Sequence, residues 1–313
     1  MAPTEDDVSI EEKRVYAGRA GRTDAYVATN GGVVRVALSA DKIGAFDMVI
    51  RDAARDVAVL PRSDALDLLG VATDEGLVVS PVGDDLSFDA VSRALARDDP
   101  ERDASDGGPT VAVGASDDAF LVAGEDGAID RVRVADSTSL NATTSRIGRV
   151  AEPRAIDGPL VASADGVHRI APSERGAPGH EVTAVGLDDA ADVAGAGMPL
   201  AATATGLYWL GNGWMSARKG PAEAVAADGG GHAMAAVDGE LFVHEDNAVG
   251  WEPETWSPTT LPVAEPAVAL GYGPGTAVVV TEAGTICVDA GDGWRHQVIG
   301  VRDVAGVALA VVE

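Results

Sequence analysis

The sequence predicts an all-β fold: a seven-bladed β-propeller of four-stranded antiparallel blades. One hairpin phrase recurs seven times, and each copy has a glycine in its turn. The turn glycines span 252 residues in six intervals, or 42 residues per interval, which is the period of four-stranded blades. Seven blades of this length account for nearly the whole chain. The turn glycines are Gly32, Gly76, Gly127, Gly166, Gly206, Gly239 and Gly284.

The recurring phrase is represented by A-T-D-E-G-L-V-V-S at residues 72–80. Two β-prone runs flank a short polar turn, the usual signature of a hairpin. Glycine is expected in the turn because it reaches a positive φ without the strain that other residues incur. The hairpins therefore supply the second and third strands of each blade.

The remaining strands lie before and after the hairpins. Segments rich in Ala and Val precede them, and such small side chains suit the crowded innermost strands of a propeller. Residues 55–60, 110–114, 192–196, 223–227 and 266–270 are predicted as inner strands. Residues 46–50, 214–218 and 294–299 are predicted as outer strands.

Blade 1 is predicted to close the ring with strands from both ends of the chain. The segment V-R-D-V-A-G-V (301–307) resembles A-R-D-V-A-V-L (54–60), so it is expected to be an inner strand. It would join the hairpin at 25–38, and closure would remove exposed sheet edges that invite aggregation. The sequence leaves open whether residues 14–18 form an inner strand, an outer strand or part of a tail.

We expect one domain over residues 1–313. Residues 1–13 are polar and acidic and are predicted to be a flexible N-terminal tail. Residues 92–108 interrupt the repeat and are predicted to be an acidic loop insertion, with a short helical start at 89–97. Solvent-facing filler is the favoured interpretation of this insertion over a functional loop.

The chain is strongly acidic, with 50 Asp and Glu against 23 Lys and Arg and a formal net charge of −27. An acidic surface, three lysines and small apolar side chains resemble the cytosolic proteins of extreme halophiles, so we expect dependence on molar salt and a cytoplasmic location. Nucleic-acid binding would need a basic face, and the arginines around blade 3 are sparse. These are Arg131, Arg133, Arg146, Arg149 and Arg154.

No membrane association is expected, because no apolar run approaches the length of a membrane helix and the N-terminus lacks the features of a signal peptide. The single cysteine, Cys287, excludes an intramolecular disulfide and any multi-cysteine metal site. Its apolar surroundings favour a buried, inert thiol.

Chain length, the motif E-E-K-R-V-Y at 11–16, the hairpins and the composition together resemble a haloarchaeal β-propeller family of uncharacterised function. The resemblance spans nearly the whole chain and brings no catalytic residues. G-N-G-W (211–214), V-G-W (249–251) and G-D-G-W (291–294) also resemble degenerate Asp-box turns. Asp boxes are structural turns, so this partial likeness implies no sialidase chemistry.

Tryptophans supply one candidate binding surface. Trp214, Trp251 and Trp294 occupy equivalent positions in blades 5 to 7, and Trp256 is expected to be exposed in the loop E-P-E-T-W-S-P. Tryptophan is enriched in binding hot spots, so these four side chains are candidate contacts for a protein partner. The competing interpretation, which we favour, is that they pack between blades.

Acidic turn residues supply a second candidate. They are expected to emerge on one face of the disc around the channel mouth, where carboxylates attract a basic partner or a cation. Ordinary surface residues are the favoured interpretation in so acidic a chain. The residues are Asp74, Glu75, Glu125, Asp126, Asp165, Asp238 and Glu282.

The sequence offers no catalytic motif. Its five histidines lack metal-ligand spacing, and D-G-G-G-H (228–232) lacks the lysine and the strand-to-helix context of a phosphate loop. We therefore expect no catalytic residue, metal or cofactor, and we predict a monomeric, non-catalytic scaffold that binds another protein. The alternative is a hydrolase, a lyase or a small-ligand binder at the channel mouth, which could use a divalent cation. Convergent His and carboxylate groups there would favour the alternative, whereas a lining of Ala, Val and Gly would favour the scaffold.

Overall fold

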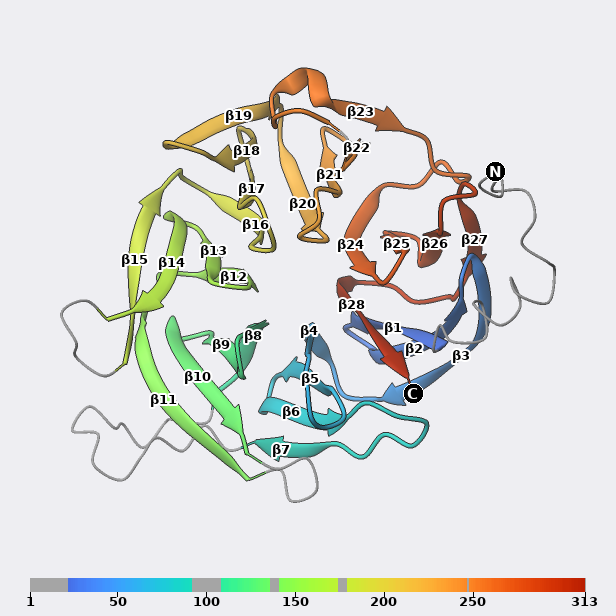
Figure 1. Ribbon diagram of the computed structural model, residues 1–313. Coiled ribbons are helices and arrows are strands. Elements are labelled where there is room, and N and C mark those ends of the chain that lie inside the picture. Colours follow the sequence, from blue (N-terminus) through green and yellow to red (C-terminus); the bar gives the residue numbers. More distant parts are fainter. Residues whose placement is uncertain (1–21, 92–107, 136–140, 174–178, 247, 313) are drawn as a thin grey trace, which may run out of the picture.

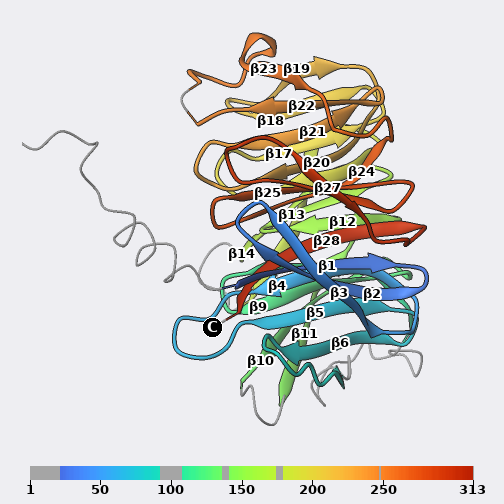
Figure 2. The ribbon, with the colours of Figure 1, turned by 90° about the vertical axis from the view of Figure 1, so that its right-hand side faces the viewer.

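A computed structural model describes residues 22–91, 108–135, 141–173, 179–246 and 248–312. Seven four-stranded antiparallel sheets surround a central axis, and Figure 1 looks along that axis. Figure 2 shows the same disc from its edge. The predicted seven-bladed propeller is confirmed.

The strand order of the first four blades runs from the centre outward. Blade 1 contains β28 (Val304–Val312), β1 (Arg22–Thr29), β2 (Gly32–Ser39) and β3 (Lys42–Ile50). Blade 2 contains β4 (Ala54–Leu60), β5 (Leu68–Thr73), β6 (Gly76–Pro81) and β7 (Asp89–Val91). Blade 3 contains β8 (Thr110–Ser116), β9 (Ala119–Gly124), β10 (Ala128–Val134) and β11 (Ala142–Arg149). Blade 4 contains β12 (Pro153–Asp157), β13 (Leu160–Ser163), β14 (Gly166–Pro172) and β15 (His180–Gly186).

The last three blades repeat this order. Blade 5 contains β16 (Ala190–Ala194), β17 (Leu200–Thr203), β18 (Gly206–Leu210) and β19 (Trp214–Lys219). Blade 6 contains β20 (Ala222–Ala227), β21 (Ala233–Val237), β22 (Glu240–His244) and β23 (Trp256–Thr259), with the short 3-10 helix η3 (Pro253–Thr255) before β23. Blade 7 contains β24 (Ala267–Gly273), β25 (Thr276–Thr281), β26 (Thr285–Asp289) and β27 (Arg295–Val298).

The ring closes where β28, near the end of the chain, pairs with β1 in blade 1. Tyr26 lies opposite Ala308, and Val27 lies opposite Val307. The predicted closure is therefore confirmed. Figure 1 shows the two strands side by side, beside the last blade of the repeat.

The tight turns between the second and third strands contain a hydrogen bond that the sequence pattern did not predict. In five blades the last residue of the second strand is Ser or Thr, and in four of these its buried hydroxyl donates to the carbonyl of the turn glycine. The Thr73 Oγ1–Gly76 O distance, for example, is 2.8 Å. This bond explains the Ser or Thr that precedes the turn in these copies of the phrase.

The predicted positive φ is found at six of the seven turn glycines, and Gly206 is the exception. Gly206 is needed for a different reason, because a Cβ there would lie 2.4 Å from the Arg218 carbonyl oxygen. At Gly32 both conditions apply: its φ is +126°, and a Cβ would lie 2.0 Å from the Ile50 carbonyl oxygen. At Gly32 and Gly206 the absence of a Cβ thus also allows the backbone of the outer strand to approach closely.

Each inner strand has an irregularity at its second residue, which has no partner in the neighbouring strand. Such a bulge bends the strand and increases its twist. The third residue then faces the channel or the next blade, and it is small in five blades and aspartate in two. The third residues are Asp56, Ala112, Ala155, Asp192, Ala224, Ala269 and Gly306.

The hydrophobic core lies between adjacent blades. One buried cluster, for example, joins Val36 and Leu38 of blade 1 to Val278 and Val288 of blade 7. Each blade therefore buries apolar side chains against its neighbours, and no blade can be removed without exposing two such clusters.

Some predicted segments need correction or lie outside the described residues. Residues 89–91 form strand β7 rather than the start of a helix, because they pair with β6 as the outer strand of blade 2. The predicted tail at 1–13, the undecided segment 14–18 and residues 92–107 of the predicted insertion lie outside the described residues. Within the described ranges, no helix is long and apolar enough to cross a membrane.

Replacing Gly32 by alanine should destabilise the protein more than replacing Gly76. The two glycines have almost the same φ, +126° and +125°, but a Cβ at Gly76 meets no heavy atom within 4 Å. Gly76→Ala should therefore cost about 1 kcal/mol for the backbone conformation alone. Gly32→Ala should cost about 1–3 kcal/mol more, because the Ile50 backbone must move. Denaturant unfolding in molar KCl measures both, and equal losses would contradict the close approach.

Candidate functional site

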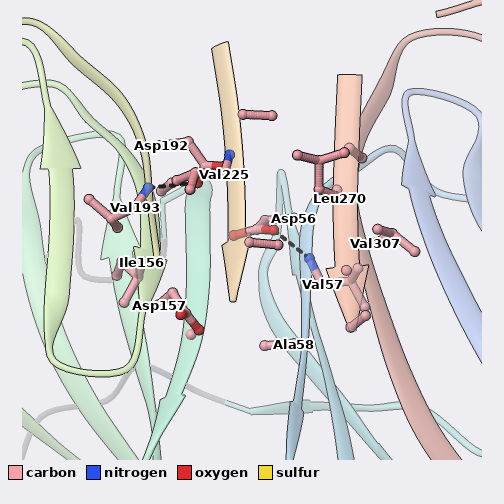
Figure 3. Close-up of a pocket in the computed structure, with 18 of the residues that line it drawn as sticks. Asp56, Val57, Ala58, Ile156, Asp157, Asp192, Val193, Val225, Leu270 and Val307 are labelled. Carbon is pink, nitrogen blue, oxygen red and sulfur yellow. Dashed lines mark hydrogen bonds between the residues drawn. The ribbon is translucent and has the colours of Figure 1, made fainter. Parts of the chain in front are cut away.

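The seven inner strands surround a central cavity of about 470 Å³. Most of its wall is built from Ala, Val and Gly, as expected for strands that crowd together around a channel. Figure 3 shows part of this wall, in which three labelled aspartates stand out among apolar neighbours. These aspartates come from blades 2, 4 and 5.

Asp56 and Asp192 connect neighbouring blades in the same way. One carboxylate oxygen of Asp56 accepts the Val57 N–H at 2.8 Å, and the other accepts the Val113 N–H of blade 3 at 2.9 Å. Asp192 accepts the Val193 N–H at 2.8 Å and the Val225 N–H of blade 6 at 2.9 Å. Each carboxylate therefore links the third residue of one inner strand to the fourth residue of the next.

Asp157 makes a related link two residues further along its strand. Its Oδ2 accepts the Gly195 N–H, just after the inner strand of blade 5, at 2.7 Å. A Cβ at position 195 would lie 2.4 Å from the Asp157 carbonyl oxygen, so only glycine permits this approach. The three channel carboxylates are thus engaged with backbone N–H groups at the seams between blades 2–3, 4–5 and 5–6.

Burial raises the pKa of these carboxyl groups. It raises the pKa of Asp56 to about 8 and that of Asp192 to about 7, although the backbone N–H bonds oppose the shift. Burial also raises the pKa of Asp157. The negative charges of Asp192 and Asp157 add to the effect at Asp56, since like charges disfavour one another in a shared channel.

The rest of the cavity offers little that could perform chemistry. Among the residues that the structure describes, no group of three or more His, Cys, Asp or Glu side chains is placed to hold a metal ion. Arg154 and Glu223 lie at the second, bulged position of their strands, and Arg154 is bonded to Asp189 of blade 5 at 2.7 Å. Tyr272 lies near the opposite end of its inner strand. Ala, Val and Gly make up most of the rest of the wall.

The predicted acidic residues lie in the turns between the second and third strands, and all seven are exposed. Because all the blades have the same strand order and direction, their equivalent turns lie on the same face of the disc. None of the seven lines the central cavity. Asp74 pairs with Arg55 at 2.6 Å, Asp126 with Arg149 at 3.5 Å, and Asp165 accepts the Ser163 hydroxyl at 2.6 Å. Glu75, Glu125, Asp238 and Glu282 have no ion-pair partner within the described ranges.

Trp214, Trp251 and Trp294 are half-buried at three successive seams. Trp214 donates its indole N–H to the Val185 carbonyl of blade 4 at 2.9 Å and packs on the cluster between blades 4 and 5. Trp251 packs on the cluster between blades 5 and 6, and Trp294 on that between blades 6 and 7. This is the inter-blade packing that the sequence favoured.

The expectation that Trp256 is exposed was wrong, because its side chain is 3% exposed. The segment before it has the composition of a loop, but Pro253–Thr255 forms the short helix η3 and Trp256 begins strand β23. Its backbone pairs with His244, and its ring lies 5.4 Å from the His244 ring, between centroids. Trp256 is therefore a core residue of blade 6.

Sequence reasoning missed Asp56 and Asp192 as residues that connect blades. The phrase R-D-V-A at 55–58 recurs at 302–305, but the recurrence is out of register. Thr29 pairs with Val304, whereas the equivalent Thr73 pairs with Ala54, so Gly306 and not Asp303 occupies the position of Asp56. Residues 54–58 and 190–194 both place an aspartate directly before a valine in an inner strand. This shared pattern was the signal that could have identified the two aspartates.

Asp56→Asn should lower stability more than Asp238→Asn. An amide has one acceptor oxygen, so either the Val57 or the Val113 N–H would lose its bond, at a cost of about 1–3 kcal/mol. Asp238 is an exposed turn residue with φ of 53°, a conformation that asparagine adopts readily. Unfolding by denaturant at pH 9 in molar KCl, above the folded pKa of Asp56, compares the two, and equal stabilities would show that the seam bond contributes nothing.

The stability of the wild type should fall as the pH rises from about 4 to about 8. The pKa of Asp56 is raised on folding, so the folded state holds its proton more tightly than the unfolded state, and this stabilisation is lost as pH passes through the folded value. Asp56→Asn should reduce the fall by roughly 1–2 kcal/mol, less than the whole shift implies because channel water screens the charge. Identical pH profiles for wild type and variant would contradict the raised pKa.

Solved structures resemble the chain in fold. YCF48 bound to D1 peptide matches with a TM-score of 0.56 and 12% identity, covering 93% of this chain and 97% of that chain. YCF48 from Cyanidioschyzon merolae matches with a TM-score of 0.54 and 13% identity, covering 80% and 86%. Human WBSCR16 matches with a TM-score of 0.52 and 13% identity, covering 86% and 88%. Identities this low establish the fold alone.

No curated protein matches the sequence. A family model, in contrast, matches nearly the whole chain, including the part of the N-terminal region from residue 9 onward. This match agrees with the resemblance that the repeats and the composition indicated. The chain belongs to the HVO_0234-like β-propeller family, whose model covers residues 9–310.

Proposed function

We propose that this propeller is a non-catalytic scaffold that binds another protein. The observation that carries the proposal is the state of the channel polar groups: Asp56, Asp157 and Asp192 all accept backbone N–H bonds between blades. Their bonds to backbone N–H groups give these carboxylates a structural role in the ring, which accounts for their presence without catalysis. The wall around them is apolar and built from small residues.

The fold is suited to binding through its faces. The YCF48 structure has a peptide bound to a propeller of similar architecture, which illustrates that the fold accommodates a protein ligand. In the present chain, one face carries the seven acidic turn residues, which lie in five of the turns. The opposite end of the blades carries exposed apolar side chains, of which Val249 is 92% exposed and Met215 is 45% exposed. These two surfaces offer different chemistry to a partner.

The second candidate is a small-ligand binder or a hydrolase or lyase at the channel mouth, and the cavity of about 470 Å³ is the observation in its favour. A cavity of this volume lies within the range of small-molecule sites. In that case the three carboxylates would remain hydrogen-bonded to the backbone as part of the cavity wall, and they would not be the reacting groups.

A tagged chain held in molar KCl should retain a stoichiometric protein partner that chemical cross-linking places on one face. Met215→Ser with Val249→Ser should abolish binding if the apolar end is the interface, and Glu75→Gln with Glu282→Gln should abolish it if the acidic face is. All four positions are exposed, so folding should be unaffected. Each pair is the control for the other. A partnerless monomer would overturn the scaffold proposal, and calorimetry with divalent cations and metabolite pools would then test the channel.

A further inference from the structure

His244 is a buried histidine in an aromatic environment, at the end of strand β22. The residue is only 3% exposed. The Trp251 ring stacks on it, with 3.9 Å between centroids and an angle of 3° between the planes. The Trp256 ring closes a second side at 5.4 Å. The imidazole is therefore almost completely shielded from solvent.

Both ring nitrogens of His244 face backbone carbonyl oxygens. Nδ1 lies 2.8 Å from the Gly231 oxygen, and Nε2 lies 2.9 Å from the Gly250 oxygen. Carbonyl oxygens only accept hydrogen bonds, and a neutral imidazole has a single N–H to donate. In the neutral ring one contact would bring two lone pairs together at hydrogen-bond distance. Two favourable contacts therefore require two N–H groups, which only the imidazolium has.

Burial by itself disfavours a charged imidazole, and two features of the surroundings oppose this effect. The flat face of Trp251 attracts a positive charge through its π-electrons. Strands β21 and β23, which flank the ring, contain no ionisable side chain. The adjacent connections are rich in carboxylates, against one nearby guanidinium that bonds the Pro253 carbonyl. The charged groups of these connections are Asp228, His232, Glu245, Asp246, Glu252 and Glu254, and Arg218 lies in the neighbouring strand β19.

His232 also contacts both the β20–β21 loop, to which it belongs, and the β22–β23 connection. Its Nδ1 lies 2.7 Å from Asp228 Oδ2, and its Nε2 lies 4.0 Å from Glu245 and 3.8 Å from Asp246. Asp228 also accepts the N–H groups of Gly230 and His232, at 2.7 and 3.0 Å. The bond to Asp228 raises the pKa of His232, and the nearby carboxylates of Asp246 and Glu245 raise it further.

We propose that protonated His232 and protonated His244 form a clasp that ties the β20–β21 loop (228–232) to the β22–β23 connection of blade 6. His244 bridges the two by its carbonyl contacts at Gly231 and Gly250, and His232 adds charge pairing to Glu245 and Asp246. The clasp responds to pH through His232, whose pairing with Glu245 and Asp246 depends on its ring proton. It is a conformational device separate from the proposed partner binding.

The direction of the response follows from His232. A histidine whose pKa is raised on folding stabilises the folded state at low pH, and this contribution is lost as pH rises through the folded value. The clasp therefore closes toward acid and loosens toward alkali. Loosening releases the Gly250 carbonyl and with it the support beneath Trp251, so the rim of blade 6 becomes mobile at high pH.

Ring-nitrogen NMR on the histidine-labelled full chain in molar KCl tests the protonation directly. At neutral pH, His244 should show two nitrogens that each carry a directly bonded hydrogen. The exposed His296 is the internal reference, because no pair of carbonyl contacts within the described ranges constrains its ring. A His244 ring with one bare nitrogen at pH 6 would overturn the proposal.

Amide hydrogen exchange tests the clasp itself. After correction for the intrinsic pH dependence, exchange at Asp228, Gly230 and His232 should rise at least threefold from pH 6 to pH 9. In His232→Gln this rise should be lost, whereas His296→Gln should behave as the wild type. His244→Gln should likewise lose it, and the His232 variant keeps the test decisive if the His244 variant does not fold. A pH-independent loop in the wild type would contradict the clasp.

Discussion

Seven inner strands share one narrow channel, and each strand is irregular at its second residue. This crowding is the constraint on which the rest of the structure depends. It restricts the third residue of each strand to a small side chain, or to an aspartate that bonds the next blade. The choice in one blade is coupled to its neighbour: a Cβ at Gly306 would lie 2.8 Å from Asp56 Oδ1, so the glycine of blade 1 makes room for the carboxylate of blade 2.

The same constraint determines what the channel can do. A carboxylate in an apolar wall would be costly unless its oxygens were hydrogen-bonded. Asp56, Asp157 and Asp192 meet this condition with backbone N–H groups from neighbouring blades, and their raised pKa values reflect the burial that remains. The polar groups of the channel are therefore explained by the closure of the ring. Function is then expected at the faces and rims of the disc, where the acidic turns and the exposed apolar residues lie.

Much of the fold was predictable because it depends on local patterns. The hairpin phrase fixes the second and third strands, and its glycines mark turns with a positive φ or a close backbone approach. Ring closure was also predictable from the Val-rich segment near the C-terminus. Trp256 was misplaced because three residues of 3-10 helix turn its ring inward, and no local pattern shows that direction. Asp56 and Asp192 were missed because their partners, Val113 and Val225, belong to the following blade and depend on the strand register.

The central claim is that channel carboxylates bond backbone amides across the seams, and amide hydrogen exchange at Val113 and Val225 tests it most directly. Both amides face a channel, so water would exchange them quickly if the carboxylates did not accept their hydrogens. The account predicts that they exchange as slowly as the amides of the strand ladders in the same blades. Fast exchange at both positions, with the ladders protected, would contradict these two seam bonds and return Asp56 and Asp192 to the candidates for ligand binding.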